Sequence, residues 1–450
     1  MSRLEEFGYK QELVRALSIR DLIVHGMIFM GPIAPFAVFG FVWTDARGMV
    51  VLAYLLGLLG MSFTALSYAA MARAFPMAGS VYSYVQRGVH EAAGFFAGWL
   101  ILLDYILVPA LCYVFSVVAL RPLLPGVPDW IWIVCFVSLN AVINVRGVQL
   151  GARVNRFILV LSLVTLMLFM VVGLAALYRG QGAGALTLRP VFDPAGFSPA
   201  TVAAATSIAV LSFLGFDAVS TLAEESCGGG AAVARATLSS LLFVALLFIA
   251  QTWLAADLAR GMHFRSTDTA FYEIAERAGG TALRDLALAA LTVAALANAL
   301  VGQSAIARIL FAMARDRRLP AILARVHPRY RTPHVSTLVV AAVSLAVCLL
   351  FARRGDDLSR VVNFGALSSF LLLHVSVINH YFVRGRSRDW LRHLVLPLGG
   401  LLVIGYVLYA MDRSAKVLGA CWIGAGVVYY TGLVLVRKRT PVLGISPGVD

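Results

Sequence analysis

The sequence predicts an all-α, polytopic membrane protein with about 12 transmembrane helices. Of its 450 residues, 60% are hydrophobic and only 13% are charged, and the mean hydropathy is +0.85. A helix needs about 20 apolar residues to span a bilayer. Spanning helices and short loops therefore account for the whole chain, and any binding site should lie within the membrane.

Twelve apolar windows of spanning length define the expected helices, each bounded by charged residues or by Pro and Gly. In chain order they are 21–43, 48–72, 91–120, 129–145, 154–178, 199–224, 232–258, 283–314, 335–352, 359–383, 390–411 and 414–436. We expect the whole chain, 1–450, to form a single domain.

The basic residues predict the orientation of these helices. The net charge is +14, from 37 Lys and Arg against 23 Asp and Glu. With the N-terminus placed in the cytoplasm, 23 basic residues fall in cytoplasmic segments and 13 on the opposite side. The positive-inside rule therefore places both termini in the cytoplasm, in a multi-pass protein of the inner or plasma membrane. Basic residues scattered over loops serve topology and lipid headgroups, so no nucleic-acid partner is expected.

Several chemistries are excluded by missing motifs. The five cysteines form no CxxC pair, and none of the three lysines follows a glycine as a P-loop requires. His90-Glu91 lacks the second histidine of HExxH. We expect no enzyme, no metal site and no cofactor.

The first window contains helix breakers near its middle. Pro32 and Pro35 lack a backbone donor, so the helix should unwind across Gly31–Pro35. In hydrocarbon, freed backbone groups persist only where they line a cavity or meet a partner. Gly31 and Ala34 are therefore expected at a substrate site. The alternative is an ordinary proline kink satisfied by neighbouring side chains.

The sixth window is interrupted in the same way, by Gly215 between Phe213 and Phe216. Broken helices five apart are typical of inverted-repeat transporters. Phe213, Gly215, Phe216 and Asp217 are therefore expected to form the second wall of the same central site. Asp217 could contact substrate directly, or could cap the second half-helix, where the helix dipole favours an anion.

Asp104 lies close to the middle of the third window, beside Tyr105. An aspartate at that depth costs about 2.5 to 3.5 kcal/mol on insertion scales, so it should face the bundle interior and have a partner. A cationic substrate or a coupling proton would serve, and so would a structural hydrogen bond to Tyr105, Arg308 or a backbone amide.

Three further residues are candidates for coupling or gating. Glu224 and Glu225 follow the second break by two turns and are expected to act as loop or gate residues. His25 in the first helix could shuttle protons, since the unperturbed pKa of histidine is near neutrality. A lone helix histidine is, however, more often a packing residue. Arg315-Asp316-Arg317-Arg318 reads most simply as a positive-inside anchor.

With these residues in hand, the chain resembles the amino acid, polyamine and organocation permease superfamily, and within it the bacterial putrescine importers. The matching stretches are Phe63–Tyr68, Ala78-Gly79-Ser80, Gly98-Trp99, Leu103-Asp104-Tyr105, Ser212-Phe213, Gly215-Phe216-Asp217, Glu224-Glu225, Ala307-Arg308, Arg315-Asp316, His327-Pro328, Arg331-Thr332-Pro333 and Asn363–Leu367. The resemblance implies a single permease domain over 1–450, built as a five-plus-five inverted repeat with broken helices 1 and 6. Its first repeat should lie at about 20–178, its second at about 199–384 and two extra helices at about 390–437. The resemblance also implies secondary active import of a small amine by alternating access, with H⁺ as the coupling ion. It also adds Asn363 in helix 10 as a coupling or gating candidate.

The chain departs from the putrescine importers at one position. Those proteins carry an acidic residue soon after the proline break of helix 1, where this chain has Ala37. A diamine carries two ammonium groups and is expected to meet more than one anion, so the loss of one carboxylate weakens the prediction of a putrescine substrate. An amino acid, a monoamine or another small polar metabolite is an alternative prediction of nearly equal weight. A membrane channel or a receptor-like protein is the alternative from a different class, and the oligomeric state stays open.

Overall fold

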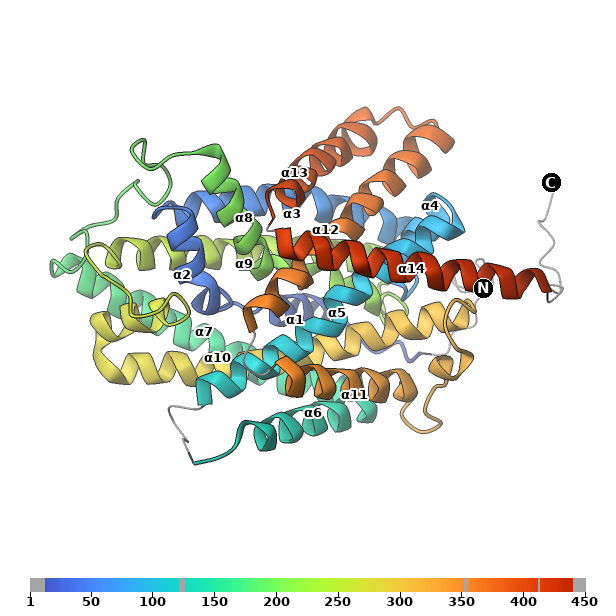
Figure 1. Ribbon diagram of the computed structural model, residues 1–450, viewed down its shortest axis with the longest axis horizontal. Helices are drawn as coiled ribbons and strands as arrows, with labels where there is room; N and C mark the ends of the chain where they lie inside the picture. The colour runs from blue at the N-terminus through green and yellow to red at the C-terminus, as the bar shows by residue number, and fades with distance from the viewer. Residues whose placement is uncertain (1–12, 121–125, 352–354, 412, 440–450) are drawn as a thin grey trace.

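The computed structural model describes residues 13–120, 126–351, 355–411 and 413–439. Within these ranges the chain is almost entirely helical, and the long helices run roughly along the long axis of the molecule (Figure 1). The elements in chain order are α1 (Ile19–Met30), α2 (Pro35–Asp45), α3 (Val50–Ala74), α4 (Ser80–Gly88), α5 (Glu91–Leu120), α6 (Asp129–Arg146), α7 (Val148–Tyr178), α8 (Pro199–Phe213), η2 (Phe216–Leu222), α9 (Gly229–Leu258), α10 (Ala270–Arg315), η3 (Ala321–Ala324), α11 (His334–Phe351), α12 (Gly355–Val377), η4 (Ile378–Arg384), η5 (Leu391–Val395), α13 (Leu396–Ala410) and α14 (Arg413–Arg439).

The expected membrane helices are confirmed. Among the described residues, ten helices are long and apolar enough to span a bilayer, and α1 with α2 makes an eleventh when the bent pair counts as one span. His334–Leu350 is a shorter apolar helix. The largest difference from the expected windows is at α10, which begins at Ala270 instead of near 283. It continues through non-helical backbone at Gly279 and Gly280, where hydropathy gives no signal.

The first span is broken where the proline pattern predicts. α1 ends at Met30 and α2 starts at Pro35, and the two axes are bent by 50°. Gly31 stands at the end of α1 with φ +70, a conformation that L side chains rarely adopt. Pro35 occupies the first turn of α2, where its missing N–H costs no hydrogen bond.

The sixth span is broken by the same device. α8 ends at Phe213, Gly215 has φ +111, and η2 continues the span as a 3₁₀-helix. α1 packs on η2 and α2 packs on α8, so each half of one broken span lies beside the opposite half of the other. A Cβ on Gly215 would lie only 2.8 Å from Phe29 Cγ. The lack of a side chain at Gly215 therefore permits this close approach of the two breaks.

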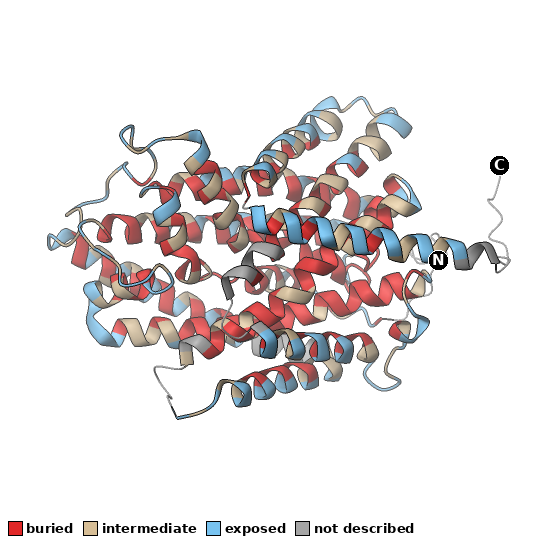
Figure 2. Ribbon diagram, viewed as in Figure 1, coloured by how far each residue is buried: buried red, intermediate tan, exposed pale blue. Residues whose placement is uncertain are grey.

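The broken spans lie among the buried helices, and α13 and α14 lie at the periphery (Figure 2). Only 11% of the apolar window of α14 is buried. α14 is attached to α5 through Trp99 and Trp422, whose rings stack at 4.7 Å. Each indole N–H donates to the backbone carbonyl of the other residue, at 2.9 and 2.7 Å.

Candidate functional site

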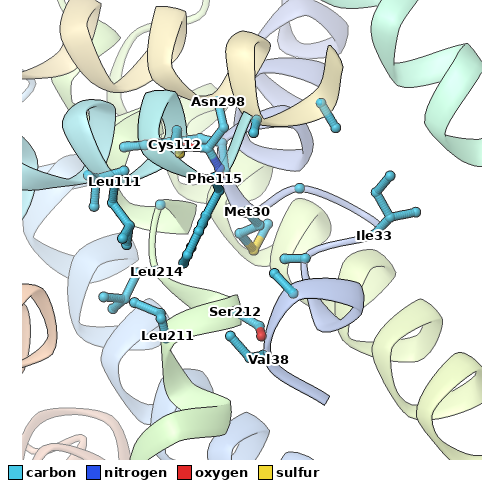
Figure 3. Close-up of a pocket in the computed structure, with 18 of the residues that line it drawn as sticks. Met30, Ile33, Val38, Leu111, Cys112, Phe115, Leu211, Ser212, Leu214 and Asn298 are labelled. Atoms are coloured by element: carbon cyan, nitrogen blue, oxygen red, sulfur yellow. Dashed lines mark hydrogen bonds between the residues drawn. The ribbon is translucent and has the colours of Figure 1, made fainter. Parts of the chain in front are cut away.

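A cavity of about 100 Å³ lies between the two helix breaks (Figure 3). Its walls come from α1, α2, α5, α8 and α10 and from the break at Leu214 and Gly215. The lining residues are Phe29, Met30, Gly31, Ile33, Ala34, Ala37, Val38, Asp104, Val108, Leu111, Cys112, Phe115, Leu211, Ser212, Leu214, Gly215, Leu291, Ala294, Ala295 and Asn298. The segments Gly31–Ala34 and Leu214–Gly215, about 180 residues apart in sequence, thus meet at one site.

Asp104 is the only charged residue in this lining. It is 3% exposed, and its Oδ1 is buried without a hydrogen-bond partner among the described residues. Most of the other lining side chains are apolar, and none is basic. Since a buried carboxylate needs a hydrogen bond, a proton or an opposite charge, the cavity is suited to a small cation with an apolar body.

α5 places Asp104 with the help of α12. A Cβ on Gly365 of α12 would lie 2.7 Å from Leu100 O and 3.0 Å from Asp104 N. The absence of a side chain at Gly365 thus lets the two helix backbones approach at the level of the carboxylate. Packing of this kind fixes the rotation of α5 and directs Asp104 inward.

Amide side chains satisfy two carbonyls of the first break. Asn298 Nδ2 of α10 donates to Phe29 O, and Gln251 Nε2 of α9 donates to Pro32 O at 2.9 Å. Neither amide was among the residues that the sequence singled out. The signal was present, since both are uncharged polar residues at the interior of long apolar helices, where they need a partner.

Asp217 is buried behind the cavity and is not part of its lining. Its Oδ2 accepts hydrogen bonds from Tyr105 at 2.6 Å and from Tyr68 at 3.3 Å, while Oδ1 has no partner among the described residues. Tyr105, expected beside the substrate, is directed to this carboxylate instead of into the cavity.

The other expected wall residues pack against aromatic neighbours. Phe213 contacts Tyr54 and Phe248, and Phe216 contacts Tyr68 and Phe370. His25 and Asn363 also lie outside the lining. His25 Nε2 is buried without a partner in the described part of the chain. Asn363 Nδ2 donates to Ser207 O at 3.0 Å.

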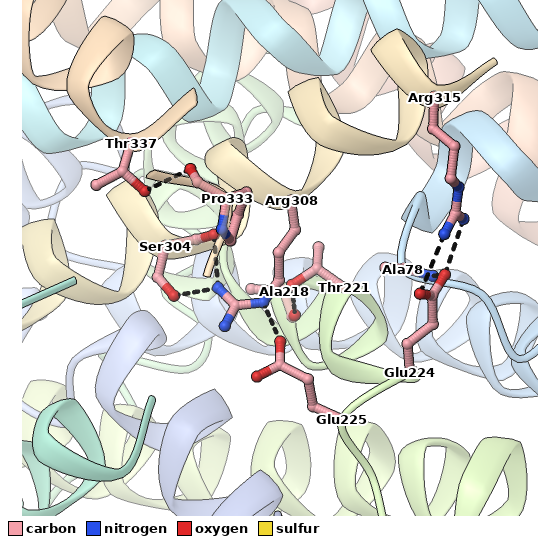
Figure 4. A network of polar contacts seen from close by, with 10 residues as sticks. All are labelled: Ala78, Ala218, Thr221, Glu224, Glu225, Ser304, Arg308, Arg315, Pro333 and Thr337. Carbon is pink, nitrogen blue, oxygen red and sulfur yellow. Dashed lines mark hydrogen bonds and ion pairs between the residues drawn. The ribbon is translucent and has the colours of Figure 1, made fainter. Parts of the chain in front are cut away.

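Glu224 and Glu225 take part in ion pairs with α10 (Figure 4). Glu224 accepts from Arg315 at 2.9 Å and from the amide of Ala78 at 3.0 Å. Glu225 pairs with Arg308, whose guanidinium also bonds Ser304. Arg308 is therefore not the partner of Asp104 that the sequence allowed.

The Arg315–Arg318 cluster, which the sequence predicts to be a topological anchor, also makes specific contacts with neighbouring helices. Arg318 pairs with Glu91 at the start of α5, and Asp316 accepts a hydrogen bond from Tyr82 of α4 at 2.7 Å. With the two glutamate pairs, these contacts join the C-terminal end of α10 to α4, to α5 and to the segment after η2. The cavity is lined instead by the end of α1, by α2 and α8, and by the middle parts of α5 and α10, at 104–115 and 291–298. The ion pairs and the cavity thus lie on opposite sides of the breaks.

Comparison with known proteins places the chain in a transporter family. The amino acid permease family pattern matches residues 26–410. The low-affinity putrescine importer PlaP of Escherichia coli K12 is 31% identical over 446 residues, covering 96% of both chains. The branched-chain amino acid permease BcaP of Bacillus subtilis is 27% identical over 451 residues, covering 94% of this chain and 93% of its own.

A third relative has a different substrate in its name. The methylthioribose transporter of Bacillus subtilis is 24% identical over 443 residues, covering 93% of each chain. These relatives match the chain over at least 93% of their own length, and their names give different substrates. They confirm the resemblance to the permease superfamily and indicate a transporter in place of an enzyme. The chain belongs to the amino acid permease family of the amino acid, polyamine and organocation superfamily.

Proposed function

We propose that the chain imports a small amine by alternating access and that proton entry drives the uptake. The observation that carries this proposal is the buried carboxylate of Asp104 in an apolar cavity between two broken helices. A cationic amine would neutralise the carboxylate, and apolar walls would accept its carbon chain. Discontinuous helices around a central site are typical of secondary transporters.

The lining favours one positive charge in the substrate. A diamine would bring two ammonium groups, but Asp217 is outside the lining and Ala37 occupies the position of the helix 1 acid. A monoamine or an apolar amino acid is therefore favoured over putrescine. The carboxylate of an amino acid would be received at the N-terminus of α2, which starts at Pro35 beside the cavity.

Uptake into proteoliposomes tests the proposal. The panel is putrescine, butylamine, leucine and methylthioribose, each with and without an inward proton gradient. We expect uptake of butylamine or leucine to exceed that of putrescine and to rise with the gradient. Transport of methylthioribose alone would contradict the amine assignment, and uptake that ignores the gradient would contradict proton coupling.

The variant Asp104→Asn tests the residue that carries the proposal. The change keeps size and most hydrogen bonding but removes the charge, so apparent affinity for a cation should fall about tenfold or more. Asp285→Asn is the matched control, because the Asp285 side chain is 46% exposed, pairs with Arg284 and is not part of the cavity lining. Equal uptake by Asp104→Asn and wild type would contradict the role of Asp104.

Alternating access requires a gate on each side of the substrate site, and the ion pairs of Glu224 and Glu225 are our candidates for one of these gates. We propose that they hold the bundle closed on their side of the breaks while the cavity is reached from the side of α2 and α8. The proposal includes an inverted repeat whose two halves are about 20–178 and 199–384.

The first described residues and the end of α14 lie at the same end of the bundle (Figure 1). This arrangement supports the proposal that both termini are on one side of the membrane.

We propose that this end faces the cytoplasm, because 23 basic residues fall in the segments on that side against 13 on the other, and that the membrane is the inner membrane. Reporter fusions after Trp43 and Arg189 should then lie outside, and fusions after Arg73 and Arg331 inside. The reversed pattern would contradict the assigned orientation and leave the transport proposal intact.

A further inference from the structure

A second cavity, unrelated to the site between the breaks, lies at the end of the bundle where α3 finishes and α13 begins. Its volume is about 310 Å³. We call it the α3–α13 cavity. It is bounded by α3, α9, η4, η5 and the start of α13, and by the connection between η4 and η5, which lies at the top of Figure 1.

One wall of the α3–α13 cavity is apolar and continues onto the bilayer-facing surface. Leu66, Leu238 and Leu396 contribute this wall. Beside it, Val395 and Leu398 are 52% and 43% exposed. In a membrane protein such side chains contact acyl chains, so a lipid tail can pass from the bilayer along the apolar wall.

The opposite rim is polar and carries an excess of positive charge. Arg73, Arg392 and His393 line it, with Asp389 as the only acid. Arg73 has no ion-pair partner in the described part of the chain. Arg392 pairs with Asp389 at 3.6 Å, with side chains that are 75% and 40% exposed. A surface pair of this kind is weak, so Arg392 can turn to a stronger anion.

Two aromatic rings hold the polar rim in place. The His393 ring stacks on Tyr381 at 4.3 Å and 5°, and its Nδ1 is 2.7 Å from Ser387 Oγ. This contact leaves Nε2 available to a ligand. Tyr381 is held in turn by a hydrogen bond from its hydroxyl to Ala70 O at 3.0 Å. The rim is thus preorganised by contacts between α3, η4 and η5.

The depth of the rim matches a lipid headgroup. α3 ends at Ala74, and the polar connection between η4 and η5 contains Trp390, which is 62% exposed. Tryptophan is enriched at the membrane–water interface. Arginines at that level, next to an apolar wall, combine the two features that an anionic phospholipid requires.

We propose that the α3–α13 cavity binds the headgroup phosphate of an anionic phospholipid of the phosphatidylglycerol type. Arg73 and Arg392 would contact the phosphate oxygens, His393 would add a donor, and an acyl chain would follow Leu66, Leu238 and Leu396. This lipid site does not depend on the identity of the transported substrate.

The test measures equilibrium binding of fluorescent phosphatidylglycerol to the purified full-length chain in a neutral detergent. Phosphatidylcholine with the same acyl chains is the comparison, and inorganic phosphate is the soluble competitor. We expect selective binding of phosphatidylglycerol that inorganic phosphate does not displace. The double variant Arg73→Gln, Arg392→Gln should weaken this binding about tenfold or more, because each arginine near an anionic headgroup contributes.

The matched control is Arg179→Gln, Arg189→Gln, which removes the same charge from exposed arginines outside the cavity and should leave lipid binding unchanged. Equal weakening by both double variants would show a general charge effect and overturn the proposal. So would equal affinity for the two lipids. Displacement by inorganic phosphate would identify a free-phosphate site and overturn the lipid assignment.

Discussion

The hydroxyl of Tyr105 donates a hydrogen bond to Asp217 Oδ2 at 2.6 Å and so joins α5 to η2. Tyr105 directly follows Asp104, whose carboxylate lines the cavity. Tyr105 and Asp217 are both buried, at 1% and 0% exposed. The bond therefore links the residue next to Asp104 to η2, the second half of the sixth span. If η2 shifts during transport, we expect this bond to carry the shift to α5.

Tyr105→Phe removes this bond while keeping the ring. A hydrogen bond contributes about 0.5 to 1.5 kcal/mol, and Tyr68 still donates to Asp217. We expect a lower melting temperature and at least a severalfold lower transport rate. Tyr113→Phe is the control, because Tyr113 accepts from Asn140 away from the cavity. It should lower stability and keep transport, and the same transport loss in both variants would contradict a specific role for Tyr105.

The buried pair of Glu225 and Arg308 should show strong energetic coupling. Arg308→Gln leaves Glu225 buried without its counter-charge, and breaking one partner of such a pair costs about 3 to 5 kcal/mol. The double variant Glu225→Gln, Arg308→Gln removes both charges and should recover most of the melting temperature. Additive losses in the double-mutant cycle would show that the two groups act independently.

A cysteine that lines the cavity should report substrate occupancy. Cys112 is part of the lining, while Cys348 is fully buried and donates to Ala110 O. Three variants each carry a single cysteine, which is Cys112 or a cysteine introduced at Ala34 or Leu214, and all their other cysteines are replaced by serine. A small polar thiol reagent should label the cysteine in each variant. Saturating substrate should protect all three positions, because they share one cavity.

A variant with Cys348 as its single cysteine is the control and should stay unlabelled. Equal labelling of Cys112 with and without a transported substrate would contradict a common binding site at the two breaks.

Gly365→Ala should disturb the site through the backbone. The new Cβ would lie 2.7 Å from Leu100 O, so α12 must move away from α5 at the level of Asp104. We expect lower stability together with reduced transport. Gly405→Ala on α13 is the matched control, because its Cβ meets nothing within 4 Å. It should be neutral or stabilising by up to about 1 kcal/mol, and a neutral Gly365→Ala would contradict the close packing.

The sequence by itself determined the helices, their breaks and the depth of the central acid. Apolar length sets where a helix can span, Gly and Pro interrupt it, and counting residues along the helix sets depth in the bilayer. Gly31, Gly215 and Asp104 could be identified on these grounds, and all three line the cavity.

Only the tertiary structure decided which side of each helix faces the cavity. In a helix that is apolar on all sides, periodicity does not fix rotation, so packing against neighbouring helices sets it. This packing turns Asp104 inward while Asp217 is met by Tyr105 and Tyr68, and it brings Asn298 to the first break. It also pairs Arg308 with Glu225, 83 residues away, because a buried charge takes the partner that folding brings within reach, and sequence spacing does not encode that distance.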